Sequence, residues 1–263
     1  MKKRRNKLKR GVALLLAILS LGMPGLMATS CIIGTLKAAT TNTVKKQLPI
    51  YCVDTGGVKK VAITFDAAWG NEDAEVIREI LNKYNVKATF FMVGDWMRKY
   101  PELVKELAAD GHDMANHSNK HPHVNQMNKE AIKQDIMAAH EEIKNITGQD
   151  CYLYRPPYGE YNDTVLQAAK ECGYETIQWD VDSLDWKGYD APTLVKKVVE
   201  HKHLGDGSII LLHNGAKHTA EALAQIIEGL QNKGYEIVPV SQLIYRGNYT
   251  LDHEGRQHLV EAR

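Results

Sequence analysis

The strongest constraint on the fold is a regular alternation of short apolar runs, rich in β-forming residues, with longer segments of helical periodicity. This alternation is typical of repeated βα units around a parallel sheet. Gly111, Gly173 and Gly234 each follow a helical segment and precede a strand, where a residue that accepts positive φ can end the helix. We expect an α/β fold, a distorted (β/α)7 barrel, with an open doubly wound sheet as the alternative. The seven predicted strands are 61–65, 88–93, 113–116, 152–155, 176–180, 208–213 and 236–240.

Residues 1–39 differ from the rest of the chain in charge and hydropathy. The first ten residues hold seven Lys and Arg and no acid, and the apolar run GVALLLAILSLGMPGLMA follows them. A basic start before such a run is typical of an export signal. We expect either cleavage, near Ala38–Ala39 or at a poor lipobox before Cys31, or retention as a membrane anchor. We therefore expect an exported protein of the cell envelope, either secreted or anchored, whose membrane contact is made through the N-terminal segment.

The remaining chain divides into three parts by composition. Residues 40–50 continue a polar stretch rich in Thr and Lys and are expected to be a linker. Residues 51–245 contain all the βα units and are expected to form one catalytic domain. Residues 246–263 are polar and are expected to be a frayed tail. No dimerisation heptad is present, so we expect a monomer.

Charge and cysteine content exclude several classes of protein. Without the seven basic residues at the start, 26 Lys and Arg stand against 32 Asp and Glu, so a nucleic-acid partner is not expected. No glycine-rich phosphate loop follows any predicted strand. Four cysteines, of which Cys31 lies in the export segment, are too few for a disulfide scaffold. The other three allow one pair and one free thiol without specifying the partners.

Polar side chains stand at the ends of five of the predicted strands. Taken singly, an Asp after a strand is usually a helix cap, and a His that ends an apolar strand is usually a core residue. The carboxyl ends of barrel strands, however, share one face, and active sites lie on that face. We therefore expect these side chains to meet in one cleft: Asp66, His117, Arg155, Asp180, Asp182 and His213.

Two histidines in the segment NHSNKHPH have a spacing suited to a metal ion. His117 and His121 stand four residues apart, so one helical turn would place both imidazoles on the same side. His123 lies close by. The pair alone is a weak motif that surface histidines also produce.

The chain contains five short motifs in a fixed order: ITFDAAWG, HSNKH, RPPYGEYN, DSLDW and LLHN. In this order and spacing they resemble the motifs of the polysaccharide deacetylases, the NodB homology group or carbohydrate esterase family 4. The likeness is closest to the PdaB-type sporulation deacetylases, which share a TFD-x-x-WG first motif and a start like LPIYCVDT. It runs from about Leu48 to Ile244.

The resemblance implies metal-assisted hydrolysis of an N-acetyl group on a glycan. An amide carbon is a poor electrophile, so the reaction needs an activated water and a proton for the departing amine. By analogy Asp66 is the general base, and Arg155 orients it and keeps it ionised. His213 is the general acid, kept cationic by Asp182 or Asp185.

The resemblance also implies a binding site around these groups. His117 and His121 would hold a divalent metal, with Zn²⁺ the expected ion. The backbone N–H of Tyr158 would stabilise the oxyanion. Trp186 and Leu211 would form apolar walls against the acetyl methyl group and the sugar.

One position departs from the family pattern. The first motif of the family is usually TFDDG, and its second Asp is the third metal ligand, whereas here Ala67 occupies that position. A methyl group cannot bind a cation, and zinc in catalytic sites normally has three protein ligands. Three possibilities remain open: Asp73 or Glu72 replaces the missing ligand, Asp66 itself becomes the ligand, or the site holds no metal.

The expected function is removal of N-acetyl groups from cell-wall amino sugars, the N-acetylglucosamine or N-acetylmuramic acid of peptidoglycan, in sporulation or envelope maturation. One alternative is a catalytically weak or silent glycan-binding domain, in which Trp69 fills the barrel mouth. A second alternative is a deacetylase of chitin or acetyl xylan.

Overall fold

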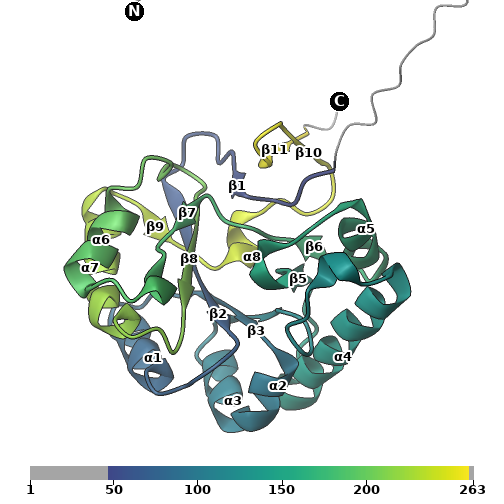
Figure 1. Cartoon of the computed structure of the whole chain (residues 1–263). Coiled ribbons are helices and arrows are strands. Elements are labelled where there is room, and N and C mark those ends of the chain that lie inside the picture. The colour runs from purple at the N-terminus through teal and green to yellow at the C-terminus, as the bar shows by residue number, and fades with distance from the viewer. Residues whose placement is uncertain (1–46, 261–263) are drawn as a thin grey trace, which may run out of the picture. The chain divides into compact units, whose positions relative to one another are not determined.

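The computed structural model describes residues 47–260 (Figure 1). The predicted export segment, residues 1–39, and the predicted linker up to residue 46 lie outside the described residues, as does Cys31. Within residues 47–260, no helix is long and apolar enough to cross a bilayer. In the same range Cys52, Cys151 and Cys172 are free thiols, so the one disulfide that the sequence allows among these three does not form.

A curled parallel sheet forms the centre of the domain, which confirms the predicted barrel-like α/β fold. Its strands run in the order β6-β5-β4-β3-β2-β8-β7, and β9 also pairs with β2. Every pair in this sheet is parallel. The strands are β2 (Lys60–Ala67), β3 (Thr89–Met92), β4 (Asp113–Asn116), β5 (Leu153–Tyr154), β6 (Glu175–Thr176), β7 (Val181–Asp182), β8 (Ile209–His213) and β9 (Glu236–Ile237).

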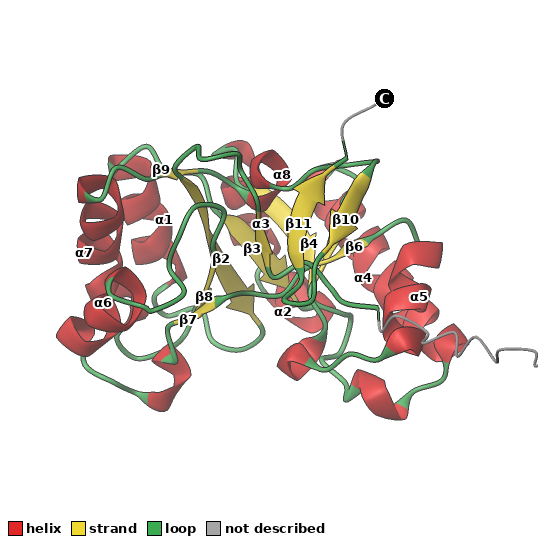
Figure 2. Cartoon of the chain, turned by 90° about the horizontal axis from the view of Figure 1, so that it is seen from above, coloured by secondary structure: helices red, strands yellow, loops and turns green. Residues whose placement is uncertain are grey.

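Helices surround the outside of this sheet (Figure 1). Helices α1, α6 and α7 gather beside β2 and β8, and α4 and α5 pack together beyond β4 (Figure 2). Gly111 and Gly173 have φ angles of 84° and 82°, in the left-handed region expected after a helix end. The helices are α1 (Ala74–Lys83), α2 (Gly94–Lys99), α3 (Pro101–Ala109), α4 (Lys129–Thr147), α5 (Asp163–Glu171), α6 (Ala191–Val199), α7 (Thr219–Asn232) and α8 (Val240–Leu243). Three 3-10 turns are η1 (Val124–Gln126), η2 (Pro157–Gly159) and η3 (Asp185–Lys187).

Two predicted strands end several residues earlier than expected. The strand predicted at 176–180 ends at Thr176, and the chain re-enters the sheet as β7. The strand predicted at 236–240 ends at Ile237, because Pro239 has no N–H to donate to a neighbouring strand and instead precedes α8.

The gap between the edge strands β6 and β7 is spanned by the start of the domain. Ile50 bridges to Ile177 and Cys52 bridges to Ser208, so residues 50–52 lie across the opening. β1 (Cys52–Val53) then continues into a second sheet with β11 (Arg256–Leu259) and β10 (Tyr249–Leu251).

The prediction of a frayed tail is therefore wrong for residues 249–259. Polar residues in this segment are satisfied by the domain itself. Gln257 is fully buried, and its side-chain amide exchanges two hydrogen bonds with the backbone of Tyr245. Arg256 donates to the carbonyl of Val53. A polar sequence can pair in this way when its side chains find fixed partners.

The sheet has a different apolar cluster on each side. Outward-facing residues of β2, among them Phe65 and Ala67, pack with α1, α6 and α7. Inward-facing residues such as Ala62 and Phe91 form a second cluster with Val240 and Leu243 of α8. The interior is therefore solid around Ala62, and the space for a ligand lies further toward the carboxyl ends of the strands.

Candidate active site

The register of β2 and β8 places Asp66 directly beside His213. The paired rows along these strands are Ala62 with Ile209, then Thr64 with Leu211, then Asp66 with His213. Side chains two residues apart point to the same side of a strand, so all three rows face inward. The first row is apolar core, and the last row ends at the carboxyl edge of the sheet. The two residues with predicted proton-transfer roles are thus neighbours.

A cavity of about 540 Å³ opens above this row. A second hollow of about 570 Å³, between residues 47–50, the end of α5 and the segment 247–252, contains none of the predicted site residues. Arg155 and Asp185 lie behind the wall of the first cavity and bond to residues that line it. Its lining is Asp66, Trp69, His117, His121, Tyr158, Gly159, Trp179, Asp182, Trp186, Leu211 and His213.

Asp66 is fixed by a fully buried arginine. Arg155 Nη1 donates to Asp66 Oδ1 at 2.7 Å and to the Thr64 hydroxyl at 2.9 Å, and Nη2 donates to the Gln178 carbonyl. The guanidinium also lies 4.0 Å from the ring centroid of Phe91. Burial opposes ionisation of Asp66, but the charge of Arg155 holds the pKa of this carboxyl below its usual range, with smaller effects from His117 and His213. Asp66 is therefore a carboxylate at neutral pH.

His117 and His121 reach the same cavity from the loop after β4. His117 Nδ1 lies 2.8 Å from the Arg155 carbonyl, which fixes Nδ1 as the donor and leaves Nε2 as an acceptor 3.5 Å from Asp66 Oδ2. The two imidazole centroids are 5.0 Å apart. Burial lowers the pKa of His117, and burial together with the neighbouring His117 imidazole lowers the pKa of His121 to about 4. Both rings are neutral near pH 7.

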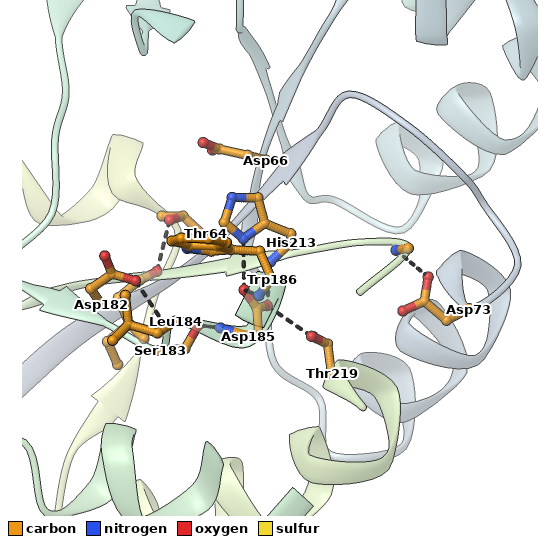
Figure 3. Close-up of polar contacts among 12 residues, drawn as sticks. Thr64, Asp66, Asp73, Asp182, Ser183, Leu184, Asp185, Trp186, His213 and Thr219 are labelled. Atoms are coloured by element: carbon orange, nitrogen blue, oxygen red, sulfur yellow. Dashed lines mark hydrogen bonds and ion pairs between the residues drawn. The ribbon is translucent and has the colours of Figure 1, made fainter. Parts of the chain in front are cut away.

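His213 is held by Asp185 and not by Asp182. Its Nδ1 lies 2.7 Å from Asp185 Oδ1, and its backbone N–H donates to Asp185 Oδ2 (Figure 3). Thr219 donates its hydroxyl to the same oxygen. Burial opposes protonation of His213, but the hydrogen bond and charge of Asp185 outweigh it and raise the pKa of the imidazole. Asp182 lines the cavity, yet its carboxylate accepts from the Leu184 N–H.

The described residues do not fit a three-ligand metal centre. Among residues 47–260, no three His, Cys, Asp or Glu side chains are grouped to hold a metal ion. Ala67 is fully buried in the outer apolar cluster and does not line the cavity. Asp73 accepts from the Gly215 N–H and lies apart from Asp66 and His213 (Figure 3). Glu72 accepts from the Asn71 N–H, so neither acid replaces the missing ligand.

Several loops of the site hold unfavourable backbone conformations. Ser118, His121, Tyr158 and Leu184 have φ angles of 74°, 55°, 59° and 56°, although none is glycine. Such conformations are unfavourable by about 1–3 kcal/mol each and persist where the surrounding structure imposes them. In this chain they direct two lining side chains, those of His121 and Tyr158, into the cavity. No local sequence signal marks these positions.

Three side chains, those of Trp179, Trp69 and Asp180, lie in other places relative to the cavity than the sequence predicted. Trp179 lines the cavity because the chain leaves the sheet after Thr176. The sequence had predicted a regular strand at residues 176–180. Trp69 also lines the cavity, with its indole 5.8 Å from the His213 ring and nearly parallel to it. Asp180 does not join the site. It accepts from the Ser208 hydroxyl and the Ile209 N–H, and burial raises its pKa to about 6.

Comparison with known proteins places this geometry in a family. The family model described as polysaccharide deacetylase matches residues 54–177. A peptidoglycan-N-acetylglucosamine deacetylase of Bacillus cereus is 35% identical over 191 residues, which cover 71% of this chain and 88% of that protein. The peptidoglycan-N-acetylmuramic acid deacetylase PdaA of Bacillus subtilis is 33% identical over 190 residues, 71% of this chain and 72% of PdaA. With YlxY, an uncharacterized protein of Bacillus subtilis, the match covers 57% of that protein.

Solved structures that resemble this fold belong to the same family. BA3943 of Bacillus anthracis, described as a pseudoenzyme of carbohydrate esterase family 4, superposes with a TM-score of 0.71 at 32% identity, over 74% of this chain and 68% of that chain. A mutant of BA3943, described as having restored enzymatic activity, has the same TM-score. The curled sheet, the five ordered motifs and these matches together show that the chain belongs to the polysaccharide deacetylase family, carbohydrate esterase family 4.

Proposed function

We propose that this protein removes N-acetyl groups from the amino sugars of the cell wall. The observation that carries the proposal is the direct pairing of Asp66 and His213 on β2 and β8 at the edge of one cavity. Each has its own buried partner, Arg155 for the carboxylate and Asp185 for the imidazole. The two pKa shifts run in opposite directions: the pKa of Asp66 is lowered by Arg155, which favours the carboxylate, and the pKa of His213 is raised by Asp185, which favours the protonated imidazole.

The proposed mechanism uses side chains of this chain, one backbone N–H and a water molecule. Asp66 Oδ2, which is not bonded to Arg155, takes a proton from a water molecule, and the resulting hydroxide attacks the acetyl carbonyl carbon. The Tyr158 N–H donates to the oxyanion that forms. The C–N bond then breaks as the protonated imidazole of His213 gives its proton to the amine. The products are acetate and a free amino sugar.

No step in this mechanism passes through a metal ion. Two imidazoles, His117 and His121, are fewer ligands than catalytic zinc normally has, so we propose that Zn²⁺ binds them only weakly. An Asp66 with a lowered pKa is a weak base toward unactivated water. We therefore expect slow turnover.

The substrate and the setting are proposed from the relatives and the sequence. Curated relatives are named as deacetylases of N-acetylglucosamine or N-acetylmuramic acid in peptidoglycan, and we propose the same polymer here. The basic and apolar start of the chain supports export to the cell envelope, either secreted or anchored in the membrane. We also propose that the protein acts in sporulation and that it is a monomer. A panel that includes chitin and acetyl xylan separates this substrate from the alternatives.

One specific observation favours a second candidate function, a glycan-binding domain with little or no activity. Ala67 stands where the family has a metal ligand, and the neighbouring acids Glu72 and Asp73 do not replace it. The similarity to BA3943, described as a pseudoenzyme, points the same way. Acetate release from purified peptidoglycan, measured together with the bound metal content of the same sample, distinguishes the two functions.

A further inference from the structure

The second hollow of the domain has the size and the build of a ligand site. Its volume of about 570 Å³ is within the range of small-ligand pockets. Its floor is buried and mostly apolar, and includes Ile50, Leu166 and Tyr174. Its rim is exposed at Lys170 and Gly173. The proposed reaction uses none of the residues that line it.

Charges of both signs surround this hollow. Lys170 lies in the last turn of α5, and its ammonium group forms no ion pair with any of residues 47–260. Glu175 lies on β6, and Asp252 follows directly after β10. The Tyr249 hydroxyl donates to Glu175 at 2.5 Å and fixes the position of this carboxylate. The hollow therefore offers one cation and two anions above an apolar floor.

This arrangement favours a ligand that carries charges of both signs. A carboxylate of the ligand would meet Lys170, and an ammonium group would meet Glu175 or Asp252. An N-acetylated glycan without substituents is neutral and has neither group. In peptidoglycan, however, the glycan bears short peptides with free carboxylates and, where they are not cross-linked, a free amino group. Such a peptide matches the hollow in charge.

The hollow also lies close, along the chain, to the cavity that contains Asp66 and His213. Thr176 lines the hollow and Trp179 lines that cavity. Three residues span at most about 11 Å even when fully extended. A peptide attached to a sugar in the cavity covers a similar distance with three or four residues. One substrate molecule is therefore long enough to reach both spaces.

We propose that the second hollow binds the peptide of peptidoglycan while the sugar lies in the cavity with Asp66 and His213. The inference rests on the proposed function, because the proposed polymer is what brings a peptide to this protein. Lys170 binds a carboxylate of the peptide, and Glu175 or Asp252 binds its amino group. The protein then prefers glycan that bears peptides to chitin, which bears none.

The experiment measures binding by isothermal titration calorimetry with three probes from one peptidoglycan preparation. They are a disaccharide-peptide, the same disaccharide after an amidase has removed the peptide, and the released peptide. We expect the disaccharide-peptide to bind at least tenfold more tightly than the bare disaccharide, because its two parts bind as one linked ligand. Added salt should reduce this difference, since Lys170 is exposed.

Substitutions of Lys170 test the charge directly. Lys170→Glu should weaken binding of the disaccharide-peptide by roughly fivefold, the effect of one exposed ion pair, and leave the bare disaccharide unchanged. Lys170→Arg keeps the charge and should keep the affinity. Lys196→Glu is the matched control, because Lys196 lies in the last turn of α6, a helix of nine residues like α5, and lines neither space.

The outcomes separate this inference from the proposed function. Equal affinity for the disaccharide with and without its peptide overturns the peptide site even if acetate is released, and so does a wild type that binds none of the probes. Equal losses in Lys170→Glu and Lys196→Glu also overturn it. If Lys170→Glu weakens the bare disaccharide as much, the hollow holds glycan and not peptide. Released peptide that binds through Lys170, without any acetate release, supports the peptide site and contradicts the deacetylase. Unfolding curves confirm that each variant is folded.

Discussion

Asp185 holds His213 at two points, through its imidazole and through its backbone. One carboxylate oxygen lies 2.7 Å from His213 Nδ1, and the other accepts the His213 N–H at 2.7 Å. The ring and the end of β8 are therefore fixed by the same side chain, which is itself almost fully buried. The arrangement favours the charged imidazole and orients it.

The pH dependence of activity follows from this contact. A general acid must be protonated, so activity is lost as pH rises through the pKa of His213, which Asp185 raises. Asp185→Asn is expected to shift the alkaline limb of kcat/KM to lower pH and to reduce the rate most at high pH. Asp182→Asn is the matched control, because Asp182 bonds to the Leu184 N–H and should cause a smaller shift. Equal shifts in the two variants would show that Asp185 has no special role.

Loss of the buried arginine should destabilise the fold. Arg155→Met leaves the Asp66 carboxylate buried without its partner, and breaking such a pair costs about 3–5 kcal/mol. The double variant Arg155→Met with Asp66→Asn should lose less stability than the sum of the single changes, because neither charge then remains. Urea denaturation of all four proteins measures the coupling. Strict additivity would mean that the ion pair contributes nothing.

His112 makes stability depend on pH away from the site. Its Nδ1 accepts the Ala88 N–H at 3.1 Å, and burial lowers its pKa from 6.5 to about 4. Between these values the unfolded chain binds the proton and the folded chain does not, so stability falls as pH drops through this range. The full loss approaches about 3 kcal/mol. His112→Asn keeps an acceptor at the same position and should flatten this part of the curve. An unchanged slope would contradict the assignment.

Restoring the family carboxylate should change the response to zinc. Ala67 is fully buried among apolar residues, so Ala67→Asp is expected to melt at a lower Tm than the wild type in EDTA. Added Zn²⁺ should then raise the Tm more in Ala67→Asp than in the wild type, provided that the end of β2 turns the new carboxylate from the outer cluster to the cavity, where it becomes a third ligand beside His117 and His121. Ala67→Asn is the matched control of similar size with a poor zinc ligand. The same zinc response in all three proteins would rule out a metal site at this position.

The sequence alone predicted that the main polar side chains of the site lie together at one edge of the sheet. Asp66, Arg155 and His213 each stand at the carboxyl end of a strand, and a parallel sheet brings such ends to one edge. The register that pairs Asp66 with His213 is seen only in the structure. The pattern of alternating strands and helices was therefore enough to predict most of the fold and the polar groups at the centre of the site.

The sequence did not predict the features that depend on loop conformations and tertiary contacts. The choice of Asp185 over Asp182 depends on a loop in which Leu184 has a φ of 56°, and no local pattern predicts that conformation. Trp179 lines the cavity only because the chain leaves the sheet early. β10 and β11 form from a polar segment whose hydrogen-bond partners, such as Tyr245, are known only once the domain has folded.

Acetate release from purified peptidoglycan tests whether Asp66 and His213 act as base and acid in one cavity. We expect slow but measurable release by the wild type and by His258→Ala, a control for loss of a histidine paired with Asp54 outside the cavity. Asp66→Asn and His213→Ala, once shown to be folded, should release none. Release at the wild-type rate by both variants would contradict these roles.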